Sequence, residues 1–218
     1  MTKNFIVIAA YNEENNISKV LTELKKEHKN IIVVDDGSGD NTFSIAKKSG
    51  AKVLKHIVNI GKGAAMKTGC DYAVKLGAEI LVLMDADGQH EPKEVKKFLK
   101  AIKGKDIVFG YRQFSKKMPF ILRFGNSFIN KITSLLFGLK IKDTQGGFRA
   151  LTSNTYKKIR WDSTDYAMES EMIANAGKKR LKYKEIPIKT IYSNKYKGTT
   201  ILDGIKIVIK TFMWRIKL

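Results

Sequence analysis

Hydrophobic positions along the chain alternate between two patterns. Short apolar runs rich in β-branched residues predict buried strands, and they occupy residues 5–10, 31–34, 51–56, 79–84 and 106–110. Between them, apolar residues at helical spacing predict helices over residues 14–27, 41–50, 63–76 and 91–103. Continuous apolar strands that alternate with helices predict an α/β domain, in which helices cover both faces of a mostly parallel sheet.

Each of four predicted strands is followed directly by a polar cluster. "YNEEN" follows the first strand, "DDGSGD" the second, "DADGQ" the central one and "GYR" the next. Turns are polar in general, but four clusters that all lie beyond the carboxyl ends of strands exceed what turns alone explain. Ligands bind at this edge of open α/β sheets. The sequence therefore predicts one binding site that the four clusters share.

The segment "LMDADGQHEP" (83–92) offers the clearest chemistry. Asp85 and Asp87 project to the same side of an extended chain, and Gln89 adds a carbonyl oxygen nearby. Hard oxygen ligands suit Mg²⁺ or Mn²⁺, which complete their coordination with substrate phosphates and water. An Asx turn with helix-capping acids fits the isolated motif equally well. We expect His90 to be a loop residue beside the site rather than a ligand.

Two further motifs have both a binding and a structural interpretation. In "VVDDGSGDNT" (33–42), Asp35 and Asp36 can accept hydrogen bonds from a nucleobase or a ribose, or can belong to a turn that leads into an N-cap. "NIGKGAAMKTG" (59–69) is neither a Walker A loop nor a Rossmann fingerprint. A glycine loop that opens a helix can still meet an anion, and Lys62 would add charge.

Composition and charge narrow the class of protein. A chain of 218 residues with 43% hydrophobic residues fits one domain with a sizeable core. The formal net charge is +20, and half of it lies in residues 178–218. Such a charge attracts nucleic acid, an anionic membrane face or phosphorylated substrates. Cys70 is the only cysteine, which excludes an intramolecular disulfide and favours a reducing compartment.

The C-terminal segment predicts an amphipathic helix. Its apolar face consists of Ile201, Leu202, Ile205, Val208, Ile209, Phe212, Met213 and Ile216, and Lys206, Lys210, Arg215 and Lys217 lie largely opposite. This pattern is typical of a helix at a membrane interface, and a helix packed on its own domain is the alternative. Residues 119–139 are a second candidate for a surface or core element. We expect neither a signal peptide nor a membrane span.

Taken in order, these motifs resemble those of family 2 glycosyltransferases, and in particular of the polyprenyl-phosphate (dolichyl-phosphate) sugar synthases. The segments that carry the resemblance are "AAYNEENN", "VVDDGSGDNT", "NIGKGAAMKTG", "MDADGQHEP", "GYR", "DTQGGFRAL" and "YAMESEMIANA". The resemblance implies a Rossmann-like nucleotide-diphospho-sugar transferase fold of type A, a divalent metal (Mg²⁺ or Mn²⁺) and inversion at the anomeric carbon. It implies a catalytic domain over residues 1–200, followed by the C-terminal helix over 201–218.

The resemblance also implies roles for individual residues. The nucleotide sugar is expected to contact Ala9, Tyr11, Glu13, Asp35, Asp36, Lys62, Asp85 and Ala86, and the metal Asp87 and Gln89. The acceptor phosphate is expected to contact Arg112, Arg123, Lys195 and Lys197, and the catalytic set is Asp87, Arg112, Arg123 and Glu171. The family's acceptor loop carries an arginine and then Gly-x-Ser-Lys. Here it reads "KYKGTTI", in which Lys195 lacks the bidentate fork of arginine.

These observations predict a cytoplasmic enzyme, peripheral at the inner face of the membrane, that moves a hexose-type sugar to a polyprenyl phosphate. A phosphate monoester attacks without a base, whereas a saccharide hydroxyl would need one of Asp165, Glu169 and Glu171. A glycan-extending transferase of the same fold is the main alternative. A nucleic-acid-binding module is disfavoured because the charge accompanies no binding motif. A nucleotidyltransferase is disfavoured because no glycine-rich basic loop follows the first strand.

Overall fold

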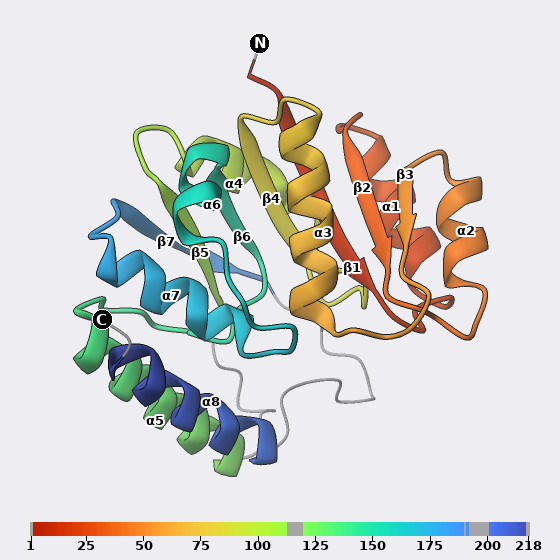
Figure 1. The fold of residues 1–218 in the computed structure, drawn as a ribbon. Coiled ribbons are helices and arrows are strands. Elements are labelled where there is room, and N and C mark those ends of the chain that lie inside the picture. Colours follow the sequence, from red (N-terminus) through yellow and green to blue (C-terminus); the bar gives the residue numbers. More distant parts are fainter. Residues whose placement is uncertain (1, 113–119, 190, 192–200, 217–218) are drawn as a thin grey trace.

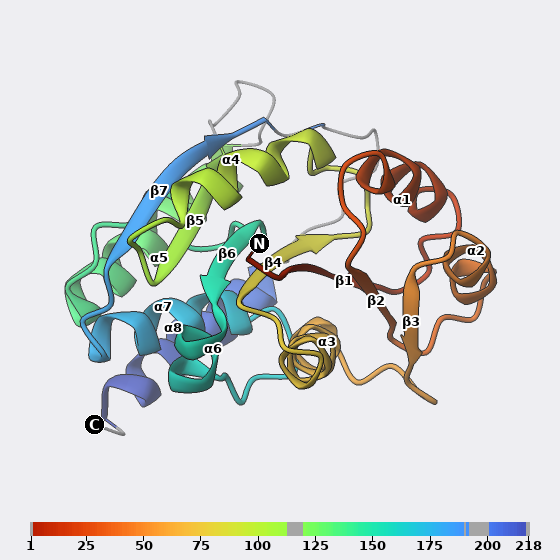
Figure 2. The ribbon, with the colours of Figure 1, turned by 90° about the horizontal axis from the view of Figure 1, so that it is seen from above.

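The computed structural model (Figure 1) describes residues 2–112, 120–189, 191 and 201–216, without the side chains of 120–128 and 201–205. Its centre is a seven-stranded sheet with helices on both faces (Figure 2). The strands are β1 (Asn4–Ala10), β2 (Ile31–Asp35), β3 (Lys52–Lys55), β4 (Ile80–Asp85), β5 (Ile107–Arg112), β6 (Arg149–Thr152) and β7 (Tyr183–Ile188). They lie in the order β3-β2-β1-β4-β6-β5-β7. The mostly parallel, helix-covered sheet predicted from the hydrophobic runs is confirmed.

The helices form two layers and one outlying pair. They are α1 (Ile17–Lys25), α2 (Thr42–Lys48), α3 (Lys62–Lys75), α4 (Val95–Ala101), which follows the 3₁₀ turn η1 (Pro92–Glu94), α5 (Phe120–Phe137), α6 (Ser153–Ile159), α7 (Met168–Lys178) and α8 (Ile201–Ile216). Alternate residues of each strand face opposite layers, so Ile6 and Ile8 pack with α1 and α4, whereas Phe5 and Val7 pack with α3 and α7. Two hydrophobic cores therefore hold the sheet between its helices.

Strand β6 runs against the direction of its neighbours. It pairs antiparallel with β4 and with β5, whereas β1–β2, β1–β4, β2–β3 and β5–β7 pair in parallel. Leu83 near the end of β4 pairs with Arg149 at the start of β6. The segment that precedes β6 therefore enters at the carboxyl edge of the parallel strands.

The parallel register brings three strand ends together at this edge. Ala10 of β1 pairs with Asp35 of β2, and Ala9 pairs with Asp85 of β4. The polar clusters that follow these strands therefore lie side by side. This edge is the lower one in Figure 1, at the end of the molecule where α5 and α8 also lie.

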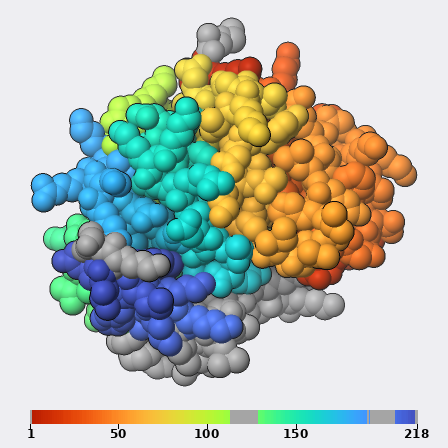
Figure 3. Space-filling model, viewed as in Figure 1, coloured from red at the N-terminus to blue at the C-terminus, as the bar shows by residue number. Residues whose placement is uncertain are grey.

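Helix α8 packs on α5 and α7 at the molecular surface (Figure 3). A small apolar cluster of Ile129, Ala167 and Ile207 fills the contact, and Lys210 pairs with Asp165 at 2.8 Å. Among the described side chains of α8, the exposed large hydrophobic ones are Ile209, Phe212, Met213 and Ile216. One side of α8 thus packs on the protein, while these members of its predicted apolar face lie outside. Among the helices that the structure describes, none has the length and apolar character needed to cross a bilayer.

Candidate active site

Lys62 lies among the charged groups at the carboxyl edge. Its Nζ is 2.7 Å from Asp85 Oδ1 and 2.8 Å from Glu169 Oε1. Burial disfavours the ammonium form, but the two carboxylates outweigh burial and raise the pKa of Lys62 above its ordinary value. A stable positive charge therefore connects the end of β4 to the start of α7.

The glycines of the "GKG" segment allow close packing around this lysine. A Cβ atom on Gly61 or on Gly63 would lie 2.4 Å from a backbone oxygen of the loop 163–165. Gly61 also has a φ of +112°, which other residues rarely adopt. In the first turn of α3, the N–H of Ala64 donates to Thr164 O at 3.1 Å. The described Ala64 amide is therefore bonded to this loop, and the glycines serve packing.

The loop before β6 completes the surroundings of Lys62. A Cβ atom on Gly147 would lie 2.7 Å from Asp85 Oδ2 and 2.9 Å from Lys62 Nζ. The loop is shaped by Arg149, whose fully buried guanidinium donates to three backbone oxygens. Burial lowers the pKa of Arg149 to about 10. Arg149 belongs to the segment "DTQGGFRAL" that carries part of the family resemblance, and in the structure its described hydrogen bonds hold backbone.

The two aspartates after β4 have unequal surroundings. Burial opposes ionisation of Asp85, but the positive charge of Lys62 outweighs it and lowers the pKa of Asp85. Burial and the charge of Asp85 raise the pKa of Asp87 to about 6. Asp87 Oδ1 accepts a hydrogen bond from the N–H of Gln89 at 2.9 Å, and no described lysine or arginine forms an ion pair with it. The charge of Asp87 is therefore the less well compensated of the two.

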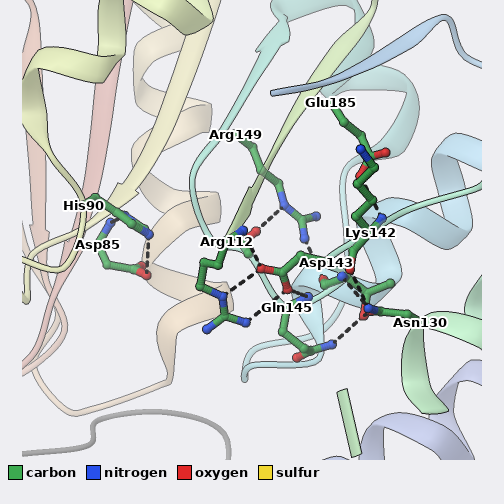
Figure 4. Close-up of polar contacts among 11 residues, drawn as sticks. Asp85, His90, Arg112, Asn130, Lys142, Asp143, Gln145, Arg149 and Glu185 are labelled. Atoms are coloured by element: carbon green, nitrogen blue, oxygen red, sulfur yellow. Dashed lines mark hydrogen bonds and ion pairs between the residues drawn. The ribbon is translucent and has the colours of Figure 1, made fainter. Parts of the chain in front are cut away.

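His90 accepts a hydrogen bond from the backbone of Asp85 and packs against Phe148. Its Nδ1 accepts the backbone N–H of Asp85 at 3.2 Å, and its ring stacks on Phe148 with centroids 5.0 Å apart. Burial lowers the pKa of His90 to about 4, so the ring is neutral at pH 7 and its proton lies on Nε2. This nitrogen faces Asp85 Oδ2 at 4.0 Å (Figure 4). His90 thus lies beside the acidic pair.

The two aspartates at the end of β2 also differ. Asp36 accepts the N–H groups of Ile60 at 3.1 Å and Gly61 at 2.7 Å, and its Oδ1 lies 2.7 Å from His56 Nδ1. Both carboxylate oxygens of Asp35 are buried, and neither has a hydrogen-bond partner among the residues that the structure describes. A buried carboxylate without a partner is costly. Asp36 therefore holds the loop after β3, while Asp35 has the capacity to accept bonds from a ligand.

The loop after β1 carries an exposed tyrosine ring and a buried glutamate that bonds within the loop. Tyr11 is 48% exposed. Glu13 is buried, and its Oε2 accepts a hydrogen bond from Asn16 Nδ2 at 2.7 Å. Ala9 is partly buried at the end of β1, and Ala86 is buried after β4. Because alanine side chains are small, the backbone at both positions is open to approach at the carboxyl edge of the sheet.

At the end of β5, Arg112 is oriented by a buried carboxylate. Its Nε donates to Asp143 Oδ2 at 2.7 Å and its Nη2 to Asp143 Oδ1 at 3.0 Å (Figure 4). Asn130 of α5 holds the same loop, because its Oδ1 accepts the N–H of Thr144 at 2.9 Å and its Nδ2 donates to Lys142 O at 2.7 Å. Sequence reasoning missed Asp143, and its only signal was an acid at the start of "DTQGGFR". A bidentate pair fixes the plane of the guanidinium.

The three candidate carboxylates around α7 have separate surroundings. Glu171 accepts the N–H groups of Asp162 and Ser163, both at 2.8 Å. Asp165 pairs with Lys210 of α8. Glu169 contacts Lys62 through Oε1, and its buried Oε2 has no hydrogen-bond partner among the described residues. Glu169 therefore joins the charged group at the edge, whereas Glu171 holds the loop before α7.

Three expected acceptor residues cannot be placed beside this group. Lys195 and Lys197 lie outside the described residues, and only the backbone of Arg123 is described, within α5.

From the predicted set, the structure brings together at one sheet edge Asp35, Lys62, Asp85, Asp87, Gln89 and Arg112, with Glu169 beside them.

Comparison with known proteins assigns the chain to a family. Residues 5–160 match the family model described as Glycosyl transferase family 2. The chain belongs to this family. This family 2 glycosyltransferase is 36% identical to a UDP-N-acetylglucosamine–dolichyl-phosphate N-acetylglucosaminyltransferase of Methanococcus voltae, over 96% of this chain and 94% of that protein. It is 27% identical to a polyprenol monophosphomannose synthase of Mycolicibacterium smegmatis, over 99% of this chain and 88% of that protein.

A solved structure shows the same fold. The glucosyl-3-phosphoglycerate synthase of Mycobacterium tuberculosis, in complex with Mn²⁺, UDP and phosphoglyceric acid, superposes with a TM-score of 0.78 at 19% identity. The match covers 98% of this family 2 glycosyltransferase and 78% of that chain. The resemblance inferred from the motifs and the type A fold are therefore confirmed, and glycosyltransferase activity is supported.

Proposed function

We propose that this glycosyltransferase moves a sugar from a nucleotide-diphosphate sugar to a polyprenyl (dolichyl-type) phosphate at the inner face of a membrane, with inversion at the anomeric carbon. The observation that carries the proposal is the position of α8 at the same end of the molecule as the acidic edge (Figure 1). Ile209, Phe212, Met213 and Ile216 are exposed there. A lipid-borne acceptor can then present its phosphate to the edge while its chain stays in the bilayer. The names of the polyprenyl-phosphate relatives support this acceptor class.

For the donor, we assign the nucleoside to the ends of β1 and β2. A nucleobase N–H or a ribose hydroxyl would supply the hydrogen bonds that the described residues do not give to Asp35. The half-exposed ring of Tyr11 offers a face for contact. The other proposed contacts are Ala9, Glu13, Lys62, Asp85 and Ala86. Asp36 supports this site indirectly, through its hydrogen bonds to the loop after β3.

Asp87 and Gln89 are the residues that we propose to hold Mg²⁺ or Mn²⁺. No group of three or more His, Cys, Asp or Glu side chains is placed to bind a metal within the described part of the chain. Donor phosphates would therefore complete the coordination, as is common for Mg²⁺. The residues fit such an ion, because a cation would compensate the charge that burial and Asp85 disfavour on Asp87. When bound, the ion would stabilise the negative charge on the leaving diphosphate.

We propose that the acceptor phosphate binds Arg112, whose plane Asp143 fixes, together with Arg123, Lys195 and Lys197. A phosphate monoester is already anionic at pH 7, so its oxygen attacks the anomeric carbon without loss of a proton. The new carbon–oxygen bond forms as the bond to the diphosphate breaks, and the nucleoside diphosphate leaves. The reaction therefore needs no general base, which agrees with the involvement of Glu171 in backbone hydrogen bonds.

The experiment that tests this function begins with a thermal-shift screen of nucleotide sugars, with Mn²⁺ or Mg²⁺ present. Transfer from the selected donor to a short polyprenyl phosphate is then measured for the wild type, Asp87→Ala and the control Glu23→Ala on the surface of α1. We expect metal-dependent transfer that Asp87→Ala abolishes and that Glu23→Ala leaves unchanged.

Two results would contradict the proposal. Transfer to a saccharide hydroxyl alone would reassign the chain to glycan extension by the same fold. Tight binding to single- or double-stranded DNA without nucleotide-sugar affinity would remove the enzymatic interpretation of the basic surface.

A further inference from the structure

The loop that joins β3 to α3 presents large aliphatic side chains to solvent. In this β3–α3 loop (residues 56–61), Ile57 is 98% exposed, Val58 63% and Ile60 48%. Clustered exposed aliphatic residues mark interaction surfaces rather than ordinary turns, which are polar. Their link to the candidate site is through the backbone, since Asp36 accepts the N–H of Ile60.

The backbone of the β3–α3 loop is held in place while its aliphatic side chains point outward. Asp36 accepts the N–H groups of Ile60 and of the next residue, and it also bonds His56 at the start of the loop. The turn after β2 packs directly beneath, because a Cβ atom on Gly37 would lie 2.5 Å from Val58 C. These contacts fix the loop from the protein side. The exposure of its side chains is therefore a property of the fold and not of a loosely placed segment.

Positive charge borders the aliphatic loop. Residues 42–56, which comprise α2, β3 and the start of the loop, contain four lysines and no acid. These lysines are Lys47, Lys48, Lys52 and Lys55, and all are exposed. Lys48 and Lys52 lie toward the amino edge of the sheet, whereas Nζ of Lys47 and Nζ of Lys55 lie 5.9 Å and 5.0 Å from the ring centroid of Phe43, at the start of α2. Aliphatic side chains bordered by lysines match the interface of an anionic bilayer, where chains bury and ammonium groups meet phosphates.

The position of the loop relative to α8 indicates a role for this surface in orienting the protein on a bilayer. The β3–α3 loop and α8 lie at the same end of the molecule (Figure 1), and both adjoin the loop 163–165, which packs on Gly61 and pairs with Lys210. A single amphipathic helix on a bilayer leaves the protein free to tilt about the helix axis. A second contact at a distance from the helix axis would remove that freedom and keep the carboxyl edge turned toward the lipid.

We propose that the β3–α3 loop is a second membrane contact, in which Ile57, Val58 and Ile60 enter the interface of an anionic bilayer. The ammonium groups of Lys47 and Lys55, which lie over the ring of Phe43, then face the lipid phosphates. This inference rests on the membrane location proposed above and adds the surface that orients the enzyme.

A fluorescent probe on the loop tests the inference directly. Cys70 is fully buried, so an environment-sensitive thiol dye on the Ile57→Cys variant labels position 57 selectively. The matched control is Lys105→Cys, an exposed position before β5 at the opposite edge of the sheet. With mixed phosphatidylglycerol–phosphatidylcholine vesicles, we expect a blue shift of the dye at position 57 and none at position 105. Pure phosphatidylcholine vesicles should give a weaker response.

Vesicle flotation of unlabelled variants provides the second measurement. We expect the double substitution Ile57→Ser with Val58→Ser to lower the affinity for the anionic vesicles by about tenfold, since two aliphatic side chains no longer enter the interface. Circular dichroism should show an unchanged fold, because both side chains are exposed in the free protein.

Three results would overturn the inference. The first is the absence of a blue shift at position 57 with anionic vesicles. The second is the same shift on addition of UDP or GDP without vesicles, which would assign the loop to the donor site. The third is a shift that grows with protein concentration alone, which would assign it to a second copy of the chain. Because the probe experiment uses no acceptor and no transfer assay, its failure is distinguishable from failure of the proposed function.

Discussion

Lys62 is the residue whose removal should disturb the site most, because it lies between two carboxylates that are largely withdrawn from water. In Lys62→Met, Asp85 and Glu169 would lose the cation they share. Removing one partner of a buried ion pair costs about 3–5 kcal/mol. We expect urea unfolding to show a loss of stability of that order for Lys62→Met.

The control for this prediction lies on the same helix. Lys75 is exposed at the end of α3, so Lys75→Met should change the free energy of unfolding by less than about 0.5 kcal/mol. Equal stability of Lys62→Met and the wild type would show that the lysine–carboxylate group contributes nothing to the fold.

At this scale, the sequence identifies the chemical groups but not their partners. Asp35 and Asp36 are neighbours in a run of two identical residues, yet one holds a loop and the other has no described hydrogen-bond partner. Glu169 and Glu171 are both glutamates of α7, two positions apart, and of the two only Glu169 contacts Lys62. Those differences depend on the loops before α3 and α7, whose approach is set by tertiary packing. The spacing of residues along the chain does not predict that packing.

Among the secondary-structure elements, α8 shows why an amphipathic pattern alone leaves two interpretations open. The helix packs on the protein through Ile207 and Thr211, which are both buried, and exposes Phe212 and Met213 on another side. Both the membrane-facing and the domain-packed interpretations of the pattern therefore describe part of the helix. Its attachment includes the ion pair between Lys210 and Asp165.

This ion pair predicts a pH dependence of the α8 attachment. Burial opposes ionisation of Asp165, but hydrogen bonds from Lys210 and from the N–H of Ala167 outweigh it and hold the pKa of Asp165 below its ordinary value. The folded state then binds this proton less tightly than the unfolded state. The stabilisation is therefore complete above the unfolded value of 3.8 and is lost as the pH falls through the lower, folded value.

Hydrogen–deuterium exchange of the α8 amides, corrected for intrinsic rates, measures this attachment. Because both partners are partly in water, we expect Lys210→Met to weaken it by no more than about 1 kcal/mol at neutral pH. The variant should also lose the extra acid sensitivity. Lys206→Met, at an exposed position on the same helix, is the matched control. An identical pH response in both variants would exclude the ion pair as the cause.

The sheet itself was predictable only in part. The five strands with continuous apolar runs were recognised from the sequence, and each of them appears in the structure. β6 has only four residues and gains its burial from pairing with β4 and β5 on its two sides. β7 is an edge strand with exposed Lys184 and Pro187. A short strand and a polar edge strand lack the apolar run on which such predictions depend.

Over the whole molecule, the net charge of +20 predicts that binding to anionic vesicles depends on salt. The Debye length falls from about 10 Å at 0.1 M salt to about 3 Å at 1 M, so the lysines should lose most of their attraction for lipid phosphates. We expect vesicle flotation to show a large fall in bound protein over this range. Binding that is unchanged at high salt would show that the aliphatic contacts act alone.

The fully buried Trp161 has a consequence for how the enzyme is made. Its Nε1–H donates to Gly63 O at 2.8 Å, next to the lysine that holds the two carboxylates. During synthesis, the first four strands and α3 leave the ribosome well before Trp161, so the surroundings of Lys62 cannot be complete until the later part of the chain arrives. Contacts between distant segments form slowly. In a Trp214→Phe variant, which leaves Trp161 as the single tryptophan, the fluorescence should therefore follow the assembly of the active site during refolding.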